Sequence, residues 1–196
     1  SGDTQYMLSG GIYLQDGLLP SSEFDKYTFR TNVQHKFNNF LKIGTHMQYS
    51  YTEANMAELS NYQGALNDIW RDGWPTLPVY REDGTFAVPQ DNPRISTLFG
   101  DAAYWNPVAN YKEVTTKSNV SRLLGDVYAE FQLAKGLTFK TNFGLDIANK
   151  RDYNYTTSKI TTSTGYGKGG NGYTKKMSRL TENILSYMNE WGDHRF

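Results

Sequence analysis

The sequence predicts an all-β fold that forms part of a large antiparallel β-barrel crossing a membrane. Apolar residues make up only 38% of the 196-residue chain, which is low for a soluble domain, while aromatic residues reach 15%. Apolar and polar residues alternate in runs of about twelve residues, roughly twice the usual strand length of soluble proteins. Short turns and long connections also alternate along the chain, as they do in outer-membrane barrels.

Six segments carry the alternation of apolar and polar residues. In one of them, the odd positions from Tyr27 to Phe37 are mainly apolar, and the even positions from Lys26 to Lys36 are polar. About twelve residues of about 3.3 Å each, tilted by about 45°, cross roughly 28 Å, which matches the apolar band of such a barrel. We therefore expect one face against lipid and one against a polar interior. The expected strands are residues 4–15, 26–37, 41–52, 122–133, 137–147 and 178–190.

The connections between these segments fall into two sizes. The tight turns are expected at 38–39, 134–136 and 192–193, and the long connections at 16–24, 53–120 and 149–177. Every long connection then falls on the same side, which we assign to the cell exterior. The 53–120 stretch is too long for a bare loop, so it predicts a short helix over residues 59–70, with turns marked by its prolines, Pro107 among them.

Composition argues against several functional classes. With 20 basic and 20 acidic residues the net charge is zero, which gives no electrostatic case for nucleic acid. The chain has no Cys, so disulfides and thiolate chemistry are excluded. His35, His46 and His194 lie on different expected strands, and no metal site is predicted. The Gly165–Gly172 patch fits a dinucleotide-binding spacing, but a strand follows it instead of a helix, so it is interpreted as a loop tip.

No catalytic residue is predicted. Asp126, Glu130 and Asp146 could place two carboxylates at the separation that glycoside hydrolysis needs. Arg122 and Lys140 stand opposite them on neighbouring expected strands, so a charge-paired barrel lining is favoured. The sequence contains neither a Ser/His/Asp order nor a nucleophile elbow. We therefore predict that the chain is not an enzyme and needs no cofactor.

Two groups of residues are candidates for contact with a ligand. The polar faces of the expected strands should line the barrel interior. The candidates there are Arg30, Asn32, Gln34, Lys42, His46, Gln48, Arg122, Asp126, Glu130, Lys140, Asn142 and Asp146. Aromatic residues of the 53–120 loop can stack on sugar rings, anchor a protein partner, or pack the loop against itself. The candidates there are Trp70, Trp74, Tyr80, Tyr104 and Trp105.

A series of strings spans nearly the whole chain in an order found in a known family. The strings are YMLSGGIYLQDG at 6–17, FDKYTFRTN at 24–32, FLKIGT at 40–45, PTLPVY at 75–80 with 83–84, NPVA at 106–109, 122–131, 136–139 with 142–144, and 182–194. Together they resemble the early barrel strands of SusC/RagA-type TonB-linked transporters. The sequence is thus similar to the wall of an outer-membrane nutrient importer.

The resemblance implies a 22-stranded barrel occluded by an N-terminal plug and closed by a SusD-like surface lipoprotein that acts as a lid. In that family the ligand is an oligosaccharide or sometimes a peptide, and the TonB complex supplies energy. It also implies the outer membrane, and hence lipid contact, in a Gram-negative, Bacteroidetes-type bacterium. Residues 1–196 would supply six to seven strands, so the plug and the rest of the barrel are expected on either side of this segment.

A second hypothesis remains open from the residues alone. The chain could be a soluble all-β module, either a carbohydrate-binding domain or an adhesin, whose long loops hold the ligand. Such a module would fold cooperatively in water without detergent. A barrel segment would not, because its apolar face needs lipid and its strand edges need partners.

Overall fold

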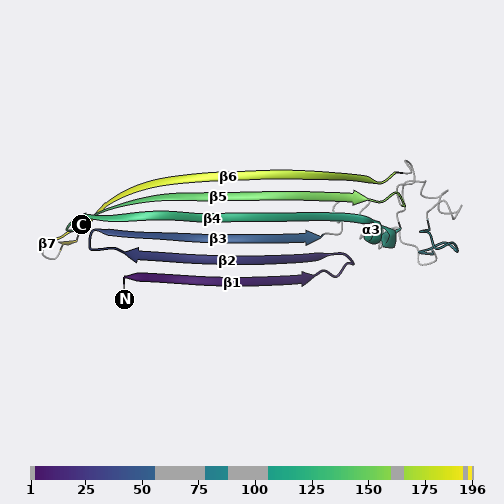
Figure 1. Ribbon diagram of the computed structural model, residues 1–196, viewed down its shortest axis with the longest axis horizontal. Helices are drawn as coiled ribbons and strands as arrows, with labels where there is room; N and C mark the ends of the chain where they lie inside the picture. The colour runs from purple at the N-terminus through teal and green to yellow at the C-terminus, as the bar shows by residue number, and fades with distance from the viewer. Residues whose placement is uncertain (1–2, 56–77, 88–105, 160–165, 192–193, 196) are drawn as a thin grey trace.

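The computed structural model describes residues 3–55, 78–87, 106–159, 166–191 and 194–195. Six strands form one antiparallel sheet in which each strand pairs with its neighbours in the chain (Figure 1). They are β1 (Thr4–Asp16), β2 (Glu23–Lys36), β3 (Leu41–Asn55), β4 (Val114–Ala134), β5 (Leu137–Thr156) and β6 (Lys168–Tyr187). Helix α3 (Pro107–Glu113) precedes β4, and β7 (Glu190–Trp191) pairs with β8 (His194–Arg195). The prediction of an all-β antiparallel fold is confirmed.

The last three strands of the sheet are longer than predicted. β4 begins at Val114 instead of 122, β5 ends at Thr156 instead of 147, and β6 begins at Lys168 instead of 178. The predicted connections 53–120 and 149–177 were therefore wrong in extent. In the added lengths, polar residues such as Lys117 and Ser118 stand on both faces, so the alternation fades while backbone pairing continues.

The short turns lie at one end of the sheet and the long connections at the other (Figure 1). Between β2 and β3, Asn38 Oδ1 accepts hydrogen bonds from the backbone N–H groups of Phe40 and Leu41, both at 2.8 Å. Between β4 and β5, Gly136 has a φ of 78°, which glycine adopts without strain. The turns predicted at 38–39 and 134–136 are confirmed, and residues 192–193 lie outside the described part of the chain.

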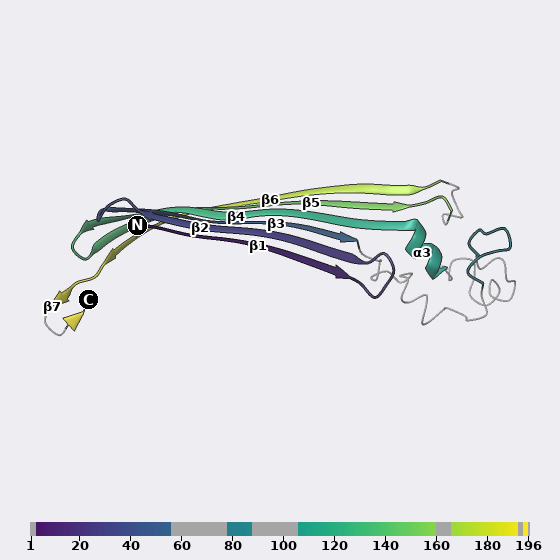
Figure 2. The same cartoon turned by 60° about the horizontal axis from the view of Figure 1, so that its bottom comes forward.

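The sheet is a single, gently curved layer (Figure 2). Within the described ranges, the buried hydrophobic residues are only Ala54, Ala87, Ala109 and Tyr128. Large apolar side chains on the strands are exposed instead, Leu8 at 63% for example. A soluble sandwich would cover such a face with a second sheet. This layer needs another apolar medium.

Helix α3 lies at the loop end of the sheet (Figure 2). Asn106 caps it, because its Oδ1 accepts hydrogen bonds from the backbone N–H groups of Val108 and Ala109 at 3.1 and 3.2 Å. Pro107, predicted to mark a turn, is instead the first helical residue, where its missing N–H costs nothing. The helix predicted over 59–70 falls outside the described residues. Among the described helices, none has the length and apolarity needed to cross a membrane.

Candidate functional site

The strand register gathers the predicted polar residues on one face of the sheet, here called the inner face. Directly paired residues point to the same side of an antiparallel sheet. Arg30 pairs with Gln48, Gln48 with Leu124, and Leu124 with Asp146. The same chains of pairing place all twelve predicted residues on the inner face. They are Arg30, Asn32, Gln34, Lys42, His46, Gln48, Arg122, Asp126, Glu130, Lys140, Asn142 and Asp146.

Tyr128 lies toward the short-turn end of the inner face and is its most buried side chain, at 6% exposure. Its ring occupies the space that a Cβ on Gly44, the paired residue of β3, would need. His46 stacks on the ring at 5.7 Å between centroids, and Lys140 Nζ lies 4.5 Å from the ring centroid. The Tyr128 hydroxyl donates to Gln34 Oε1 at 3.2 Å. One aromatic side chain thus links four strands, from β2 to β5.

Charged side chains of the inner face are paired across strands. Arg122 donates to both carboxylate oxygens of Asp146, at 2.8 and 2.6 Å. His46 Nδ1 lies 3.1 Å from Asp126 Oδ2. The predicted opposition of acids and bases is therefore present, and Arg122 with Asp146 shows it most directly. Groups compensated in this way form a polar lining, and they are not arranged as an acid–base pair for catalysis.

Among the described residues, two hollows are lined mainly by residues of the inner face. One, of about 290 Å³, is lined by residues of β1, β2 and β3 that include Gln5, Gln34 and His46. The other, of about 440 Å³, lies toward the loop end between β4, β5 and β6, where Lys150 and Asp152 form an ion pair at 2.8 Å. Sequence reasoning missed the second hollow because it placed residues 149–177 in a loop. The sequence did contain a signal for it, because polar residues such as Asn154 continue the even-numbered positions of the inner face beyond the predicted end of β5.

The opposite face of the sheet, here called the outer face, is apolar in a band that crosses the strands obliquely. Across one row of paired residues the face is apolar or aromatic on β1 to β3 and polar on β4 to β6. The row is Ile12, Tyr27, Tyr51, Ser121, Asn149 and Lys175. An oblique boundary is expected for barrel strands that tilt relative to a membrane. β6 departs from the pattern, with Leu180 and Ile184 on the inner face.

A cluster of loop residues surrounds helix α3. Tyr80 stacks on Phe86 at 5.4 Å between centroids, and its hydroxyl accepts a hydrogen bond from Lys112 Nζ at 2.8 Å. This hydrogen bond raises the pKa of Lys112. Tyr80 is the one predicted loop aromatic that the described residues include. Trp70, Trp74, Tyr104 and Trp105 lie outside them.

Glu113, at the end of α3, ties the helix to the loop that follows β5. Its carboxylate accepts a hydrogen bond from the Thr157 hydroxyl at 2.6 Å and one from Lys159 Nζ at 2.9 Å. These contacts, led by the Thr157 hydrogen bond, lower the pKa of Glu113. Sequence reasoning missed Glu113, because its partners lie more than forty positions away.

Metal ligands do not gather in the described part of the chain, where no three His, Asp or Glu side chains form a site. His35 instead hydrogen-bonds Thr4 at 2.7 Å, and His46 pairs with Asp126. Both contacts are between neighbouring strands. They hold side chains in place on the sheet.

Comparison with known proteins gives a consistent likeness. No family model matches the sequence. The chain is 25% identical over 197 residues to TonB-dependent receptor P26 of Formosa agariphila, and 25% identical over 202 residues to TonB-dependent receptor P3 of the same organism. Each match covers 99% of this chain and 19% of the receptor, so the chain spans about a fifth of the length of these relatives.

Solved structures show the same fold. The RagAB peptide importer matches in its open-open state with a TM-score of 0.75 at 20% identity, covering 98% of this chain and 21% of that one. Its closed-closed state matches with a TM-score of 0.71 over 96% of this chain and 21% of that one, also at 20% identity. The names of these similar proteins are those of receptors and importers.

Proposed function

We propose that this chain, which is a barrel segment of a SusC/RagA-like TonB-dependent receptor of the outer membrane, forms part of the wall of a nutrient importer. One observation carries the proposal. The single-layer sheet has an apolar outer face and a polar inner face whose side chains form hydrogen bonds and ion pairs between strands. An outer-membrane barrel requires both faces, one toward lipid and one toward a wet interior. In this proposal the twelve inner-face residues line the lumen.

The ligand proposed first is an oligosaccharide. Some charged groups of the inner face are paired, as Arg122 is with Asp146, while amides such as Gln5, Asn32 and Asn142 supply neutral donors and acceptors. Such a lining suits a ligand rich in hydroxyl groups. A peptide is the second candidate, and the likeness to the RagAB peptide importer favours it. Both ligands would enter from the loop end.

Two protein partners complete the proposal. A SusD-like lipoprotein would close over the loop end of the barrel, where Tyr80 and Lys112 offer an aromatic ring beside a cation. Tyr80, with Trp70, Trp74, Tyr104 and Trp105, is proposed to contact this lid or the ligand. The TonB complex would act through parts of the receptor other than this segment.

Uptake by the whole receptor tests the proposal. The receptor and its neighbouring lipoprotein gene would be expressed in a strain that lacks both, and uptake of defined oligosaccharides and peptides would be measured. Uptake that depends on the lipoprotein and on TonB is the expected result. A receptor that reaches the membrane folded and supports uptake of neither ligand class would contradict the importer.

An inner-face variant shows whether the wall participates. Gln34→Leu should lower ligand affinity, because it replaces an amide beside Tyr128 with an apolar group. The control is Val33→Leu on the adjacent, outward position, which should bind ligand as the wild type does. Equal affinity of both variants would remove the inner face from ligand contact.

The soluble-module hypothesis finds no support in the described strands. A carbohydrate-binding or adhesin domain would bury its large apolar residues, whereas Tyr6 and Ile12 are 76% and 72% exposed. These side chains need an apolar medium around them, and the lipid of the proposed membrane location supplies it.

A further inference from the structure

Four cations stand on the outer face of the last three strands. They are Lys117 on β4, Arg151 on β5, and Lys175 and Arg179 on β6. Lys175 pairs with Asn149, two residues from Arg151, and Lys117 pairs with Tyr153, two residues beyond Arg151. These pairings place Lys117, Arg151 and Lys175 close together, and Arg179 follows Lys175 on the same face of β6. The four cations are here called the cationic belt.

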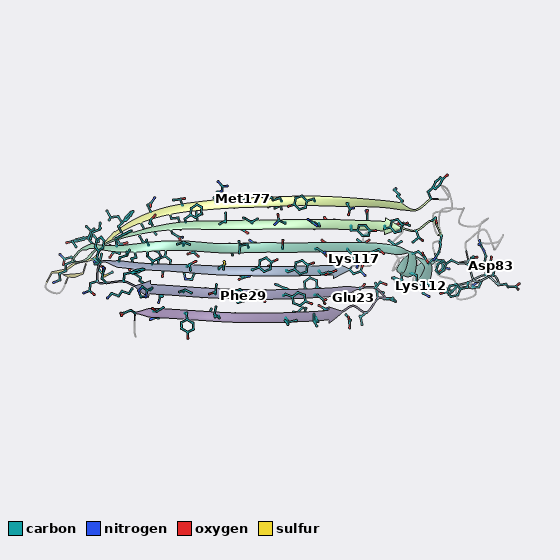
Figure 3. The ribbon with its side chains drawn as sticks, viewed as in Figure 1. Glu23, Phe29, Asp83, Lys112, Lys117 and Met177 are labelled. Atoms are coloured by element: carbon teal, nitrogen blue, oxygen red, sulfur yellow. The ribbon has the colours of Figure 1, made fainter. Side chains whose placement is uncertain are left out.

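The belt begins where the apolar band ends. Leu123, Ile147 and Met177 lie on one row of paired residues and close the band on these strands. In Figure 3, Met177 and Phe29 lie near the middle of the sheet, and Lys117 lies toward the loop end. With the outer face against lipid and the loop end at the cell exterior, as in the proposed function, the belt would lie at the height of the headgroups in the outer leaflet.

Arg179 is the belt member that lies inside the apolar band, and its side chain reaches toward the other three. Met177 is the next residue on the outer face of β6 toward the loop end, and Arg179 Nη2 lies 3.8 Å from Met177 Sδ. A long basic side chain keeps its apolar stem in lipid and extends its charge to the interface in this way.

The belt cations are exposed and lack anionic partners. None of the four forms an ion pair with a carboxylate of the described residues. Arg151 lies over the Tyr173 ring at 5.9 Å, and the Tyr173 hydroxyl donates to Asn149 at 3.0 Å. These contacts hold the guanidinium at the surface and leave its N–H groups available.

Acidic residues occupy the same height on the other half of the outer face. They are Asp16, Glu23, Asp25 and Glu53, on β1 to β3. Figure 3 places Glu23 toward the loop end, as it does Lys117. The basic residues stand on β4 to β6 and the acidic residues on β1 to β3. An anionic headgroup is therefore attracted to β4 to β6 and repelled from β1 to β3.

We propose that the cationic belt binds the phosphate groups of outer-leaflet glycolipid, the lipid A part of lipopolysaccharide. This inference rests on the proposed function, because it needs the outer face against lipid. Clustered Lys and Arg at a membrane interface attract anionic headgroups, and guanidinium groups bind phosphate through paired hydrogen bonds. Tyr153 and Tyr173 add the aromatic flank that barrels place at this height.

Native mass spectrometry of the whole receptor tests the belt. The detergent-purified receptor would be titrated with diphosphoryl lipid A, and the bound lipid counted. The variant R151Q/K175Q removes two belt charges, and its affinity is expected to fall about thirtyfold. R151K/K175R keeps both charges and should bind as the wild type does, which separates charge from folding.

The matched control is K150Q/K176Q. Lys150 and Lys176 are the chain neighbours of Arg151 and Lys175 and lie on the inner face at nearly the same height. This control loses the same charge and should keep its lipid A affinity. Dephosphorylated lipid A should bind the wild type about as weakly as lipid A binds R151Q/K175Q. Inorganic phosphate in excess should not displace lipid A.

The outcomes separate the two proposals. Equal lipid A affinity of R151Q/K175Q and K150Q/K176Q would overturn the belt and leave the uptake results standing. Displacement by inorganic phosphate would also overturn it, because the belt would then be a site for free anions. A selective loss in R151Q/K175Q, found in a receptor that imports neither oligosaccharide nor peptide, would support the belt and overturn the importer.

Discussion

The two faces of the sheet obey different rules, although they are built from alternate residues of the same strands. On the outer face, exposed side chains such as Leu8 and Ile12 share one property, apolarity. On the inner face, Tyr128 depends on particular partners, Gly44 and Gln34 among them. The difference teaches that, if the outer face contacts lipid as proposed, lipid selects a class of residue, whereas packing and hydrogen bonding select individual residues. Each face should therefore tolerate what the other does not.

The largest loss of stability is expected when a charged residue is placed on the outer face. Val127 lies midway along the band of β4 and is 54% exposed. Val127→Arg should lower the free energy of unfolding by about 2–4 kcal/mol, because a charged group enters lipid near the midplane. The measurement is equilibrium unfolding of the whole receptor in lipid vesicles.

Position along the strand supplies the control. Asn119→Arg puts the same charge on the outer face of β4 beyond the band, where it should cost about 0–1 kcal/mol. Val127→Leu, an apolar exchange, should be nearly neutral. Equal losses for the two arginine variants would mean that the band does not mark the membrane.

A smaller effect is expected from volume on the inner face. Gly44→Ala should cost about 1–3 kcal/mol, because the added methyl group displaces the Tyr128 ring. The same unfolding assay measures it. Combining Gly44→Ala with Tyr128→Ala should remove most of the added cost, since no ring remains to be displaced. Additive losses in the double variant would show that the ring is not what excludes the methyl group.

At the loop end, beyond the apolar band, Glu113 also depends on particular partners, which are Thr157 and Lys159. Its lowered pKa means that its ionised form is favoured in the folded state, so its contribution is present above the ordinary carboxyl pKa of 4.5. The contribution is lost as the pH falls through the lowered value. Glu113→Gln should raise the opening constant of α3 on the order of tenfold at neutral pH.

Hydrogen exchange of α3 amides, corrected for intrinsic rates, measures this opening. The wild type should lose protection in acid, and Glu113→Gln should lack that loss. Glu82→Gln, at an exposed carboxylate in the turn between Tyr80 and Phe86, is the matched control and should behave as the wild type does. An acid response retained in Glu113→Gln would assign the loss to another group.

The smallest effect on stability is expected at an inner-face ion pair. Asp146→Asn removes the negative charge that pairs with Arg122, but the side chains of Asp146 and Arg122 are partly exposed, at 30% and 51%. The unfolding midpoint should stay within experimental error, because exposed pairs contribute little. Uptake of an anionic ligand relative to a neutral one should rise, since the lining gains a net positive charge. A large loss of stability would show that this pair is structural.

Sequence predicted the strands best where one face is apolar and the other is polar. From Tyr27 to Val33 the alternation is clear because apolar or small residues occupy one side of β2 and polar residues the other. At Lys117 and Asn119 the signal disappears, since neither side of β4 needs apolar residues there, although the strand continues. Helix α3 was missed even though Asn106 before Pro107 is a favourable start for a helix.

By itself, the sequence determined the fold class, the end that carries the loops, and the face on which residues of the predicted strands stand. These properties are local, because a side chain's direction follows from its parity along the strand. Only the tertiary structure decided which residues meet. His46 and Asp126 are 80 positions apart, and Glu113 and Thr157 are 44 apart. Backbone hydrogen bonds between distant segments fix that register, and no local pattern records it.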